Sequence, residues 1–152
     1  MLVQAACCGA PYTSTLDSMA NIAEPPFLLD SARVVMYSET GGSDAYTGRI
    51  TVHADGRWLE PVPRLAICED LVDGDILILH CDDSWNVLAA GGAKSVEDAQ
   101  RIAESAYSGV TSRWVLYRAL TANEVTELEA EREELRLLAK QLPKQEGDPH
   151  AV

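Results

Sequence analysis

The chain has 152 residues, of which 47% are hydrophobic, a length and composition typical of one globular domain with a buried core. It carries 24 Asp and Glu residues against 12 Lys and Arg residues, a formal net charge of −12. Because such a charge repels phosphate backbones and anionic lipid head groups, we expect neither nucleic-acid nor membrane binding. The same charge favours a basic protein as partner.

The apolar segments and the cysteines indicate a cytoplasmic protein. No apolar stretch approaches the ~20 residues that a membrane helix needs, and the first residues lack the positive charge of a secretory signal. The four cysteines do not form a dense framework, and Cys7 and Cys8 are adjacent, so reduced thiols are favoured over disulfides.

The chain divides into three parts. Residues 1–27 contain small, polar and proline residues without a sustained period, and we expect them to form a disordered leader. Residues 28–142 are expected to form one α+β domain, and the polar residues 143–152 a flexible tail.

The first half of the domain predicts a meander of short strands. Asp55-Gly56 is a typical two-residue hairpin turn. The run 76–79 has no polar alternation, so we expect a central strand that is buried on both faces. Strands are expected at 33–37, 48–53, 57–59, 65–68, 76–79 and 85–88.

Two helices begin with capping sequences. Ser95 is followed by Asp98, and Thr121 is followed by Glu124, the spacing at which an N-cap side chain and the third helical residue satisfy each other's backbone. The second helix is expected to continue to about residue 142, where Pro143 ends it.

A further strand is expected between the helices, over 110–120. The fold class is therefore α+β, with a mostly antiparallel sheet of about five or six strands, one packed helix and a long C-terminal helix alongside or projecting. Val125, Leu128, Leu135 and Leu142 form a seam on that last helix, which favours packing on the sheet and leaves pairing with a second chain open.

The run His80-Cys81-Asp82-Asp83 is the only cluster of potentially reactive side chains. Neighbouring strand residues point to opposite faces, so His80 is poorly placed to act as a base for the Cys81 thiol. We expect a strand that ends at Cys81 and a turn made by the two aspartates. An enzyme that uses Cys81 or His80 remains the third alternative for function, and no catalytic residue is assigned.

Metal and cofactor sites are not expected. The three histidines lie far apart in the sequence, and no C-x-x-C pair occurs. Gly91-Gly92 precede Lys94-Ser95 as at the end of a phosphate-binding loop, but the first glycine of that motif is replaced by Val87.

The stretch 28–118 contains a C-D-x-x-W-x-V strand that ends at Val87, then a helix, and then a Y-x-G-V-x-x-x-W segment that ends at Trp114. In this order of motifs the chain resembles a group of small bacterial α+β proteins to which no activity is assigned. The resemblance implies the fold and no particular chemistry. In general build it is also loosely similar to immunity proteins, which neutralise basic toxins.

The leading hypothesis for function is a non-enzymatic, acidic protein-interaction module, with an immunity-type inhibitor of a basic partner as its most concrete form. The second is a small structural domain that self-associates through its C-terminal helix, which would make a homodimer. Trp58 lies beside the hairpin and near prolines, where exposure is expected. The residues expected to bind the partner are Trp58, Asp73, Asp75, Asp82, Asp83, Glu127 and Glu131.

Overall fold

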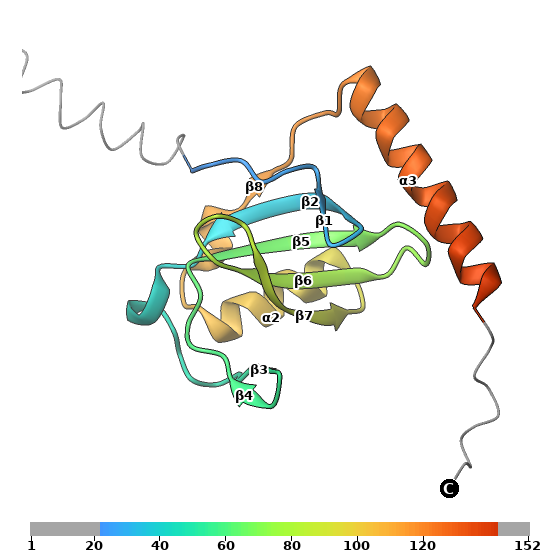
Figure 1. Ribbon diagram of the computed structural model, residues 1–152. Helices are drawn as coiled ribbons and strands as arrows, with labels where there is room; N and C mark the ends of the chain where they lie inside the picture. Colours follow the sequence, from blue (N-terminus) through green and yellow to red (C-terminus); the bar gives the residue numbers. More distant parts are fainter. Residues whose placement is uncertain (1–21, 143–152) are drawn as a thin grey trace, which may run out of the picture.

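Two central antiparallel strands, β5 (Arg64–Asp70) and β6 (Ile76–Cys81), organise the computed structural model, which describes residues 22–142 (Figure 1). Successive side chains of β6 enter opposite faces of the sheet. Ile78 packs in the cluster beneath helix α2, and Leu79 packs in the cluster on the other face. The expected central strand, buried on both faces, is confirmed.

The sheet has the strand order β1–β2–β5–β6–β7, and all of its pairs are antiparallel. One edge is covered, because β1 pairs with the start of β2 and β8 pairs with its second half. β7 forms the other edge. The bounds of these strands are Leu28–Leu29 for β1, Ala32–Glu39 for β2, Val87–Ala93 for β7 and Val115–Leu116 for β8.

Helix α2 (Val96–Ala106) covers one face of the sheet (Figure 1). Its buried residues are alanines, which let the helix lie close to the strands. The Ser95 side chain accepts a hydrogen bond from the Asp98 backbone N–H at 3.0 Å, so the predicted cap is confirmed. With this helix, the mostly antiparallel sheet and the long α3, the predicted α+β class is confirmed.

The opposite face is covered by the chain that enters the sheet. Pro25 is fully buried, the Trp85 indole N–H donates to the Ala23 carbonyl at 3.0 Å, and the Tyr117 hydroxyl donates to the Pro25 carbonyl at 2.8 Å. Residues 22–27 thus pack on the sheet, although we expected them to belong to the leader. The remaining residues of the expected leader, 1–21, and the expected tail lie outside the described residues.

The predicted strand at 48–53 is wrong except at its last residue. Only His53–Ala54 (β3) pairs, with Arg57–Trp58 (β4), across the predicted hairpin turn. That turn is confirmed, with a positive φ of 54° at Asp55 and 77° at Gly56. The chain before it is a loop, in which the Tyr46 hydroxyl donates to the Ile50 carbonyl at 2.8 Å.

Two further predicted strands differ from the structure. Over 110–120 the chain forms the 3₁₀ turn η2 (Val110–Arg113) and only then the short β8, because Val110 is drawn into the α2-side cluster. A second 3₁₀ turn, η1 (Gly42–Asp44), lies in the loop after β2. The strand expected at 85–88 is β7 and extends to Ala93.

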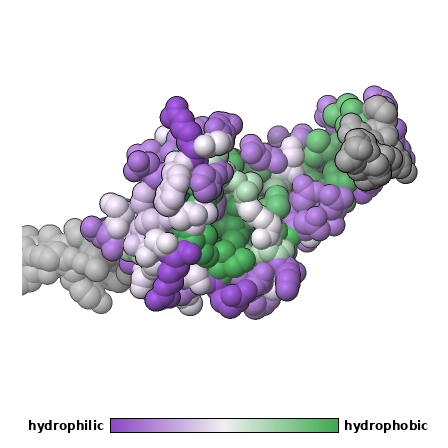
Figure 2. Space-filling model, turned by 90° about the horizontal axis from the view of Figure 1, so that it is seen from below, coloured by the Kyte–Doolittle hydropathy of each residue, from purple (hydrophilic) through white to green (hydrophobic). Residues whose placement is uncertain are grey.

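Figure 2 shows a hydrophobic area near the middle of the face seen from below, the side of the sheet on which β7 is the last strand.

Helix α3 (Ala122–Gln141) begins at the predicted capping box, where the Thr121 and Glu124 side chains each bond the other residue's backbone. It projects beside the sheet and buries a single residue, Leu128 (Figure 1). Close packing of its whole seam on the sheet, the favoured interpretation, is therefore wrong. None of the helices in the described part of the chain is long and apolar enough to cross a membrane.

Removal of residues 22–27 should destabilise the domain. A chain that begins at residue 28 loses the burial of Pro25 and the carbonyls that bond Trp85 and Tyr117, so its free energy of unfolding should be about 2–4 kcal/mol lower than that of a chain that begins at residue 22. Urea denaturation of the two chains measures the difference. Equal midpoints would show that this segment adds no stability.

Candidate protein-interaction surface

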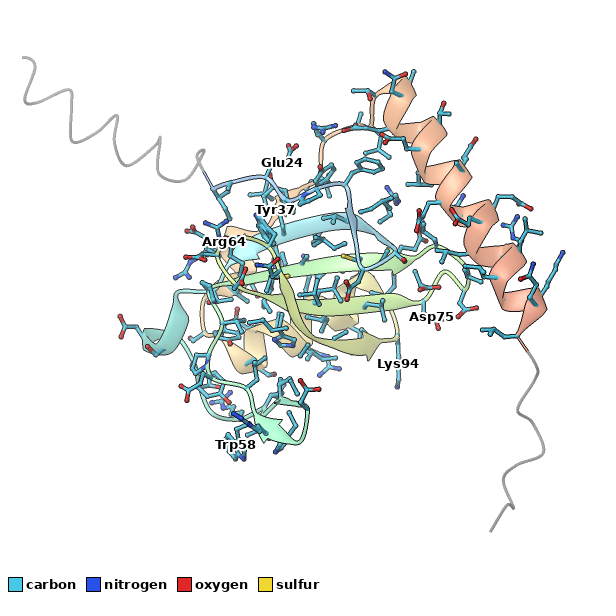
Figure 3. All side chains as sticks on the ribbon, in the orientation of Figure 1. Glu24, Tyr37, Trp58, Arg64, Asp75 and Lys94 are labelled. Carbon is cyan, nitrogen blue, oxygen red and sulfur yellow. The ribbon has the colours of Figure 1, made fainter. Side chains whose placement is uncertain are left out.

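One end of the molecule brings together two acidic segments that are far apart in the sequence. The turn between β5 and β6 lies against the middle of α3, where the Arg132 Nε donates to the Leu71 carbonyl at 3.1 Å. Figure 3 shows Asp75 at this end of the sheet. We call the surface formed by residues 70–75 and α3 the acidic end. It holds four of the predicted partner-binding residues, namely Asp73, Asp75, Glu127 and Glu131.

The turn itself is held by Asp70. One oxygen of its carboxylate accepts hydrogen bonds from the backbone N–H groups of Val72 and Asp73, at 3.0 and 2.9 Å. The exposed carboxylates of Asp73 and Asp75 make no bond to another described residue. They are therefore available to bind a positively charged group of a partner.

Helix α3 contributes six glutamates against three Lys and Arg residues. Glu127 is exposed, and Glu131, which precedes Arg132, is half-buried. The same end exposes apolar side chains, because Val72 is 40% exposed and Leu138 is 49% exposed. The acidic end thus combines negative charge with apolar side chains that a partner could cover.

A network of charged groups holds the start of α3, and the sequence predicted only one of its members. The Arg118 guanidinium donates to both oxygens of Glu124, at 2.7 and 2.8 Å, and its Nε donates to Glu24 at 3.1 Å. The bond from Arg118 lowers the pKa of Glu124 to about 2. The capping spacing predicted Glu124, but Glu24 and Arg118 are 94 positions apart and carry no local pattern.

Asp82 and Asp83 lie elsewhere, at the opposite end of β6 from the turn that carries Asp73 and Asp75. Asp82 forms the turn into β7, as predicted. Its carboxylate accepts from the backbone N–H groups of Ser84 and Asn86, each at 2.9 Å, and from the Asn86 side chain at 3.0 Å. The Asn86 bonds lower the pKa of Asp82. Asp83 is exposed.

Trp58 is exposed, as predicted, with 64% of its surface accessible. It stands on the β3–β4 hairpin, away from Asp75 (Figure 3), and its ring meets the His53 ring edge-on with centroids 5.6 Å apart. The predicted partner-binding residues therefore occupy three places, and only the acidic end joins segments that are distant in sequence.

His80 and Cys81 do not form a catalytic pair. Cys81 lies in the cluster on the face opposite α2, its thiol donates to the Leu79 carbonyl at 3.8 Å, and burial raises its pKa to about 12. Burial lowers the pKa of His80 to about 4. Because neighbouring residues of β6 point to opposite faces, the His80 imidazole is not placed to accept the Cys81 proton.

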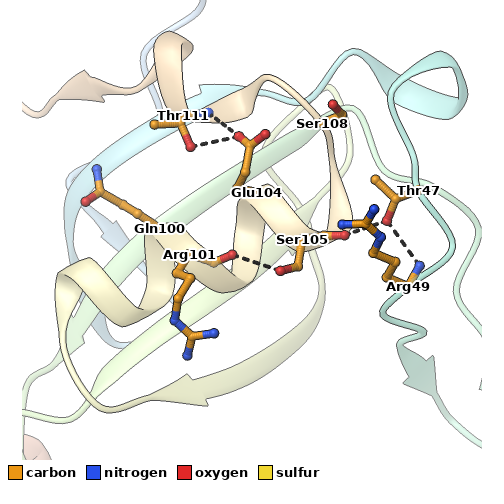
Figure 4. A pocket seen from close by; sticks show the side chains of 8 residues that line it. All are labelled: Thr47, Arg49, Gln100, Arg101, Glu104, Ser105, Ser108 and Thr111. Carbon is orange, nitrogen blue, oxygen red and sulfur yellow. Dashed lines mark hydrogen bonds between the residues drawn. The ribbon is translucent and has the colours of Figure 1, made fainter.

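A shallow polar pocket of about 450 Å³ lies beside the C-terminal half of α2 (Figure 4). Its Glu104 carboxylate is engaged by the backbone N–H groups of Gly109 and Thr111 and by the Thr111 hydroxyl. Arg49 and Arg101 also line it, and Arg101 is paired with Asp98. The Thr47 and Ser105 hydroxyls donate to main-chain carbonyls, so most of the polar groups of the pocket already hold the loops around α2.

Over residues 22–142, no group of three or more His, Cys, Asp and Glu side chains is placed to hold a metal ion. Comparison of the chain with protein families, curated proteins and solved structures finds no match. The argument for function therefore rests on the chain's own residues.

The buried His80 should make stability depend on pH in a window set by its pKa. Its pKa is about 4 in the folded chain and 6.5 ordinarily, so the unfolded chain binds a proton first as the pH falls. Stability is full above about pH 6.5, and the free energy of unfolding should fall by about 3 kcal/mol between pH 6.5 and 4. Urea titrations of the natural chain and of His80→Gln measure this slope. An equal slope in the variant would assign it to other groups.

Proposed function

We propose that the chain is a non-enzymatic protein-interaction module that binds a basic protein through the acidic end. The observation that carries this proposal is the meeting of the 70–75 turn with α3, where the carboxylates of Asp73, Asp75 and Glu127 have no role in the fold. An inhibitor of a basic toxin, of the immunity type, is its most concrete form.

Electrostatics supports fast and selective encounter at this surface. A net charge of −12 attracts a basic partner over a distance, and free carboxylates then meet its cations without first breaking internal bonds. Val72 and Leu138 supply apolar surface for the centre of such a contact. Buried, free Cys68 and Cys81 are in keeping with a reducing compartment such as the cytoplasm.

Charge reversal at the turn should weaken partner binding. The double variant Asp73→Lys, Asp75→Lys should lose about tenfold or more in affinity for a partner that the full-length chain captures from a lysate of its source organism. The captured protein should be basic. Raising the ionic strength from about 0.01 to about 0.15 M shortens the Debye length from about 30 to about 8 Å, and should release it.

The matched control is the double variant Asp44→Lys, Glu60→Lys, which changes the net charge equally at two exposed residues outside the acidic end. It should retain most of the affinity. Equal losses in the two variants would mean that only the overall charge matters, and capture of no basic protein would remove the proposal.

A second candidate is self-association through α3, and it rests on a specific observation. Leu135 is half-buried, whereas Leu138 and Leu142, which follow it on the same face of the helix, are 49% and 67% exposed. The apolar seam thus continues past the point where the domain covers it, as it would in a helix that pairs with a second copy.

Two leucines of equal exposure test this candidate. Leu138 lies on the seam side of α3, whereas Leu137, 48% exposed, lies on the opposite side. If the chain self-associates through the seam, Leu138→Glu should be a monomer by light scattering, and Leu137→Glu should keep the dimer mass. A monomeric natural chain would exclude the candidate.

A further inference from the structure

The outer edge of β7 is an unpaired row of main-chain groups. β7 bonds only to β6, so alternate residues along Val87–Ala93 direct their N–H and C=O groups away from the sheet. Within the described residues these outward groups make no further backbone bond. The opposite edge of the sheet differs, because β1 and β8 cover it.

β7 is only partly protected against a further strand: its pairing with β6 is irregular at Leu88, and the β3–β4 hairpin lies near it. Its sequence, Val-Leu-Ala-Ala-Gly-Gly-Ala, has no charge and no proline, the residues by which natural edges avoid further strands. Leu88 is 40% exposed, and Ala90, Gly91 and Gly92 are also exposed. The exposed run from Ala90 to Gly92 is therefore the part of the edge that is open to another strand.

Acidic residues stand at both ends of this edge. Asp82 and Asp83 precede β7, whereas Asp75 precedes Ile76, the partner of Ala93 at the other end. Lys94 is the cation next to the strand. The β3–β4 hairpin borders the same side of the sheet and presents the exposed Trp58 (Figures 1 and 3).

We propose that β7 binds an extended segment of the basic partner as an added strand. The segment has an uncharged centre and basic residues at both ends, which bind Asp75 on one side and the exposed Asp83 on the other. A second copy of this chain is the less suitable occupant, because it brings the same net charge of −12. This inference rests on the proposed function and names the form in which the partner binds.

The test uses a synthetic peptide with a Thr-Val-Thr-Val-Thr-Val-Thr centre and two lysines at each end, added to the full-length chain. Amide hydrogen exchange, followed by NMR, should show slower exchange at the outward amides of β7 and at few other places. A peptide N-methylated at alternate central residues cannot complete a ladder, and it should give no protection. A peptide with glutamates at its ends should bind more weakly.

Gly91 and Gly92 offer a variant that tests the edge without disturbing the fold. Neither has a positive φ, and a Cβ at either position would meet no atom within 4 Å. Gly91→Lys, Gly92→Lys should weaken binding of the lysine-ended peptide roughly tenfold, because the two added charges lie within a few positions of the lysines at that end of the peptide and repel them. Asp44→Lys adds the same charge at an exposed residue of η1 and should leave binding nearly unchanged.

The outcomes separate this inference from the proposed function. No protection of β7, or equal binding of the N-methylated peptide, overturns the inference. Partner binding that is lost in Asp73→Lys, Asp75→Lys but kept in Gly91→Lys, Gly92→Lys overturns the inference and leaves the proposed function standing. Protection that rises with protein concentration alone, together with a dimer mass, would assign the edge to a second copy and also overturn it.

Discussion

Burial of β6 on both of its faces is the constraint on which the rest of the structure depends. Its apolar side chains alternate between two clusters, so each face of the sheet must be covered before the strand leaves water. Helix α2 supplies one cover, and its alanines let it lie close to Ile67 and Ile78. Residues 22–142 contain no second helix that packs on the other face.

The other face of the sheet is covered by irregular chain, and such a segment has no helix or strand periodicity by which its sequence could be recognised. Trp85 lies edge-on to Tyr37, with ring centroids 5.8 Å apart, and Tyr117 lies edge-on to the same ring at 6.0 Å. The main-chain carbonyls of Ala23 and Pro25 accept the bonds that the Trp85 and Tyr117 rings must make when they are buried. An aromatic layer closed by backbone carbonyls thus replaces a helix.

Local signals could be read from the sequence, and long-range ones could not. The capping residues Ser95 and Thr121 were predicted because each acts within three positions, and Asp55-Gly56 because the turn needs only two residues. The run 48–53 alternates as a strand does, but no strand is available to pair with it and it packs as a loop.

β7 shows the reverse error. Alanine and glycine have low strand propensity, and the predicted strand ended at Leu88, yet pairing with the buried β6 holds the run extended to Ala93. The sequence predicted which residue types would form the candidate surface, but not where those residues lie in the fold. Acidic residues were expected to bind a partner, but only the fold brings Asp73 and Glu127 to one end and sends Asp82 to the other.

Charge by itself does not mark a binding surface in so acidic a chain, and the hydrogen bonds provide the distinction. Asp82, Asp98, Glu104 and Glu124 each accept bonds from nearby N–H groups, and these bonds lower their pKa values. A partner could engage these carboxylates only in competition with the turns and helix ends that they hold. The carboxylates on the 70–75 turn and on α3 that lack such bonds can bind a partner without breaking hydrogen bonds inside the fold. A net charge of −12 therefore contains a structural part and a free part, and the acidic end is where free carboxylates from two distant segments of the chain come together.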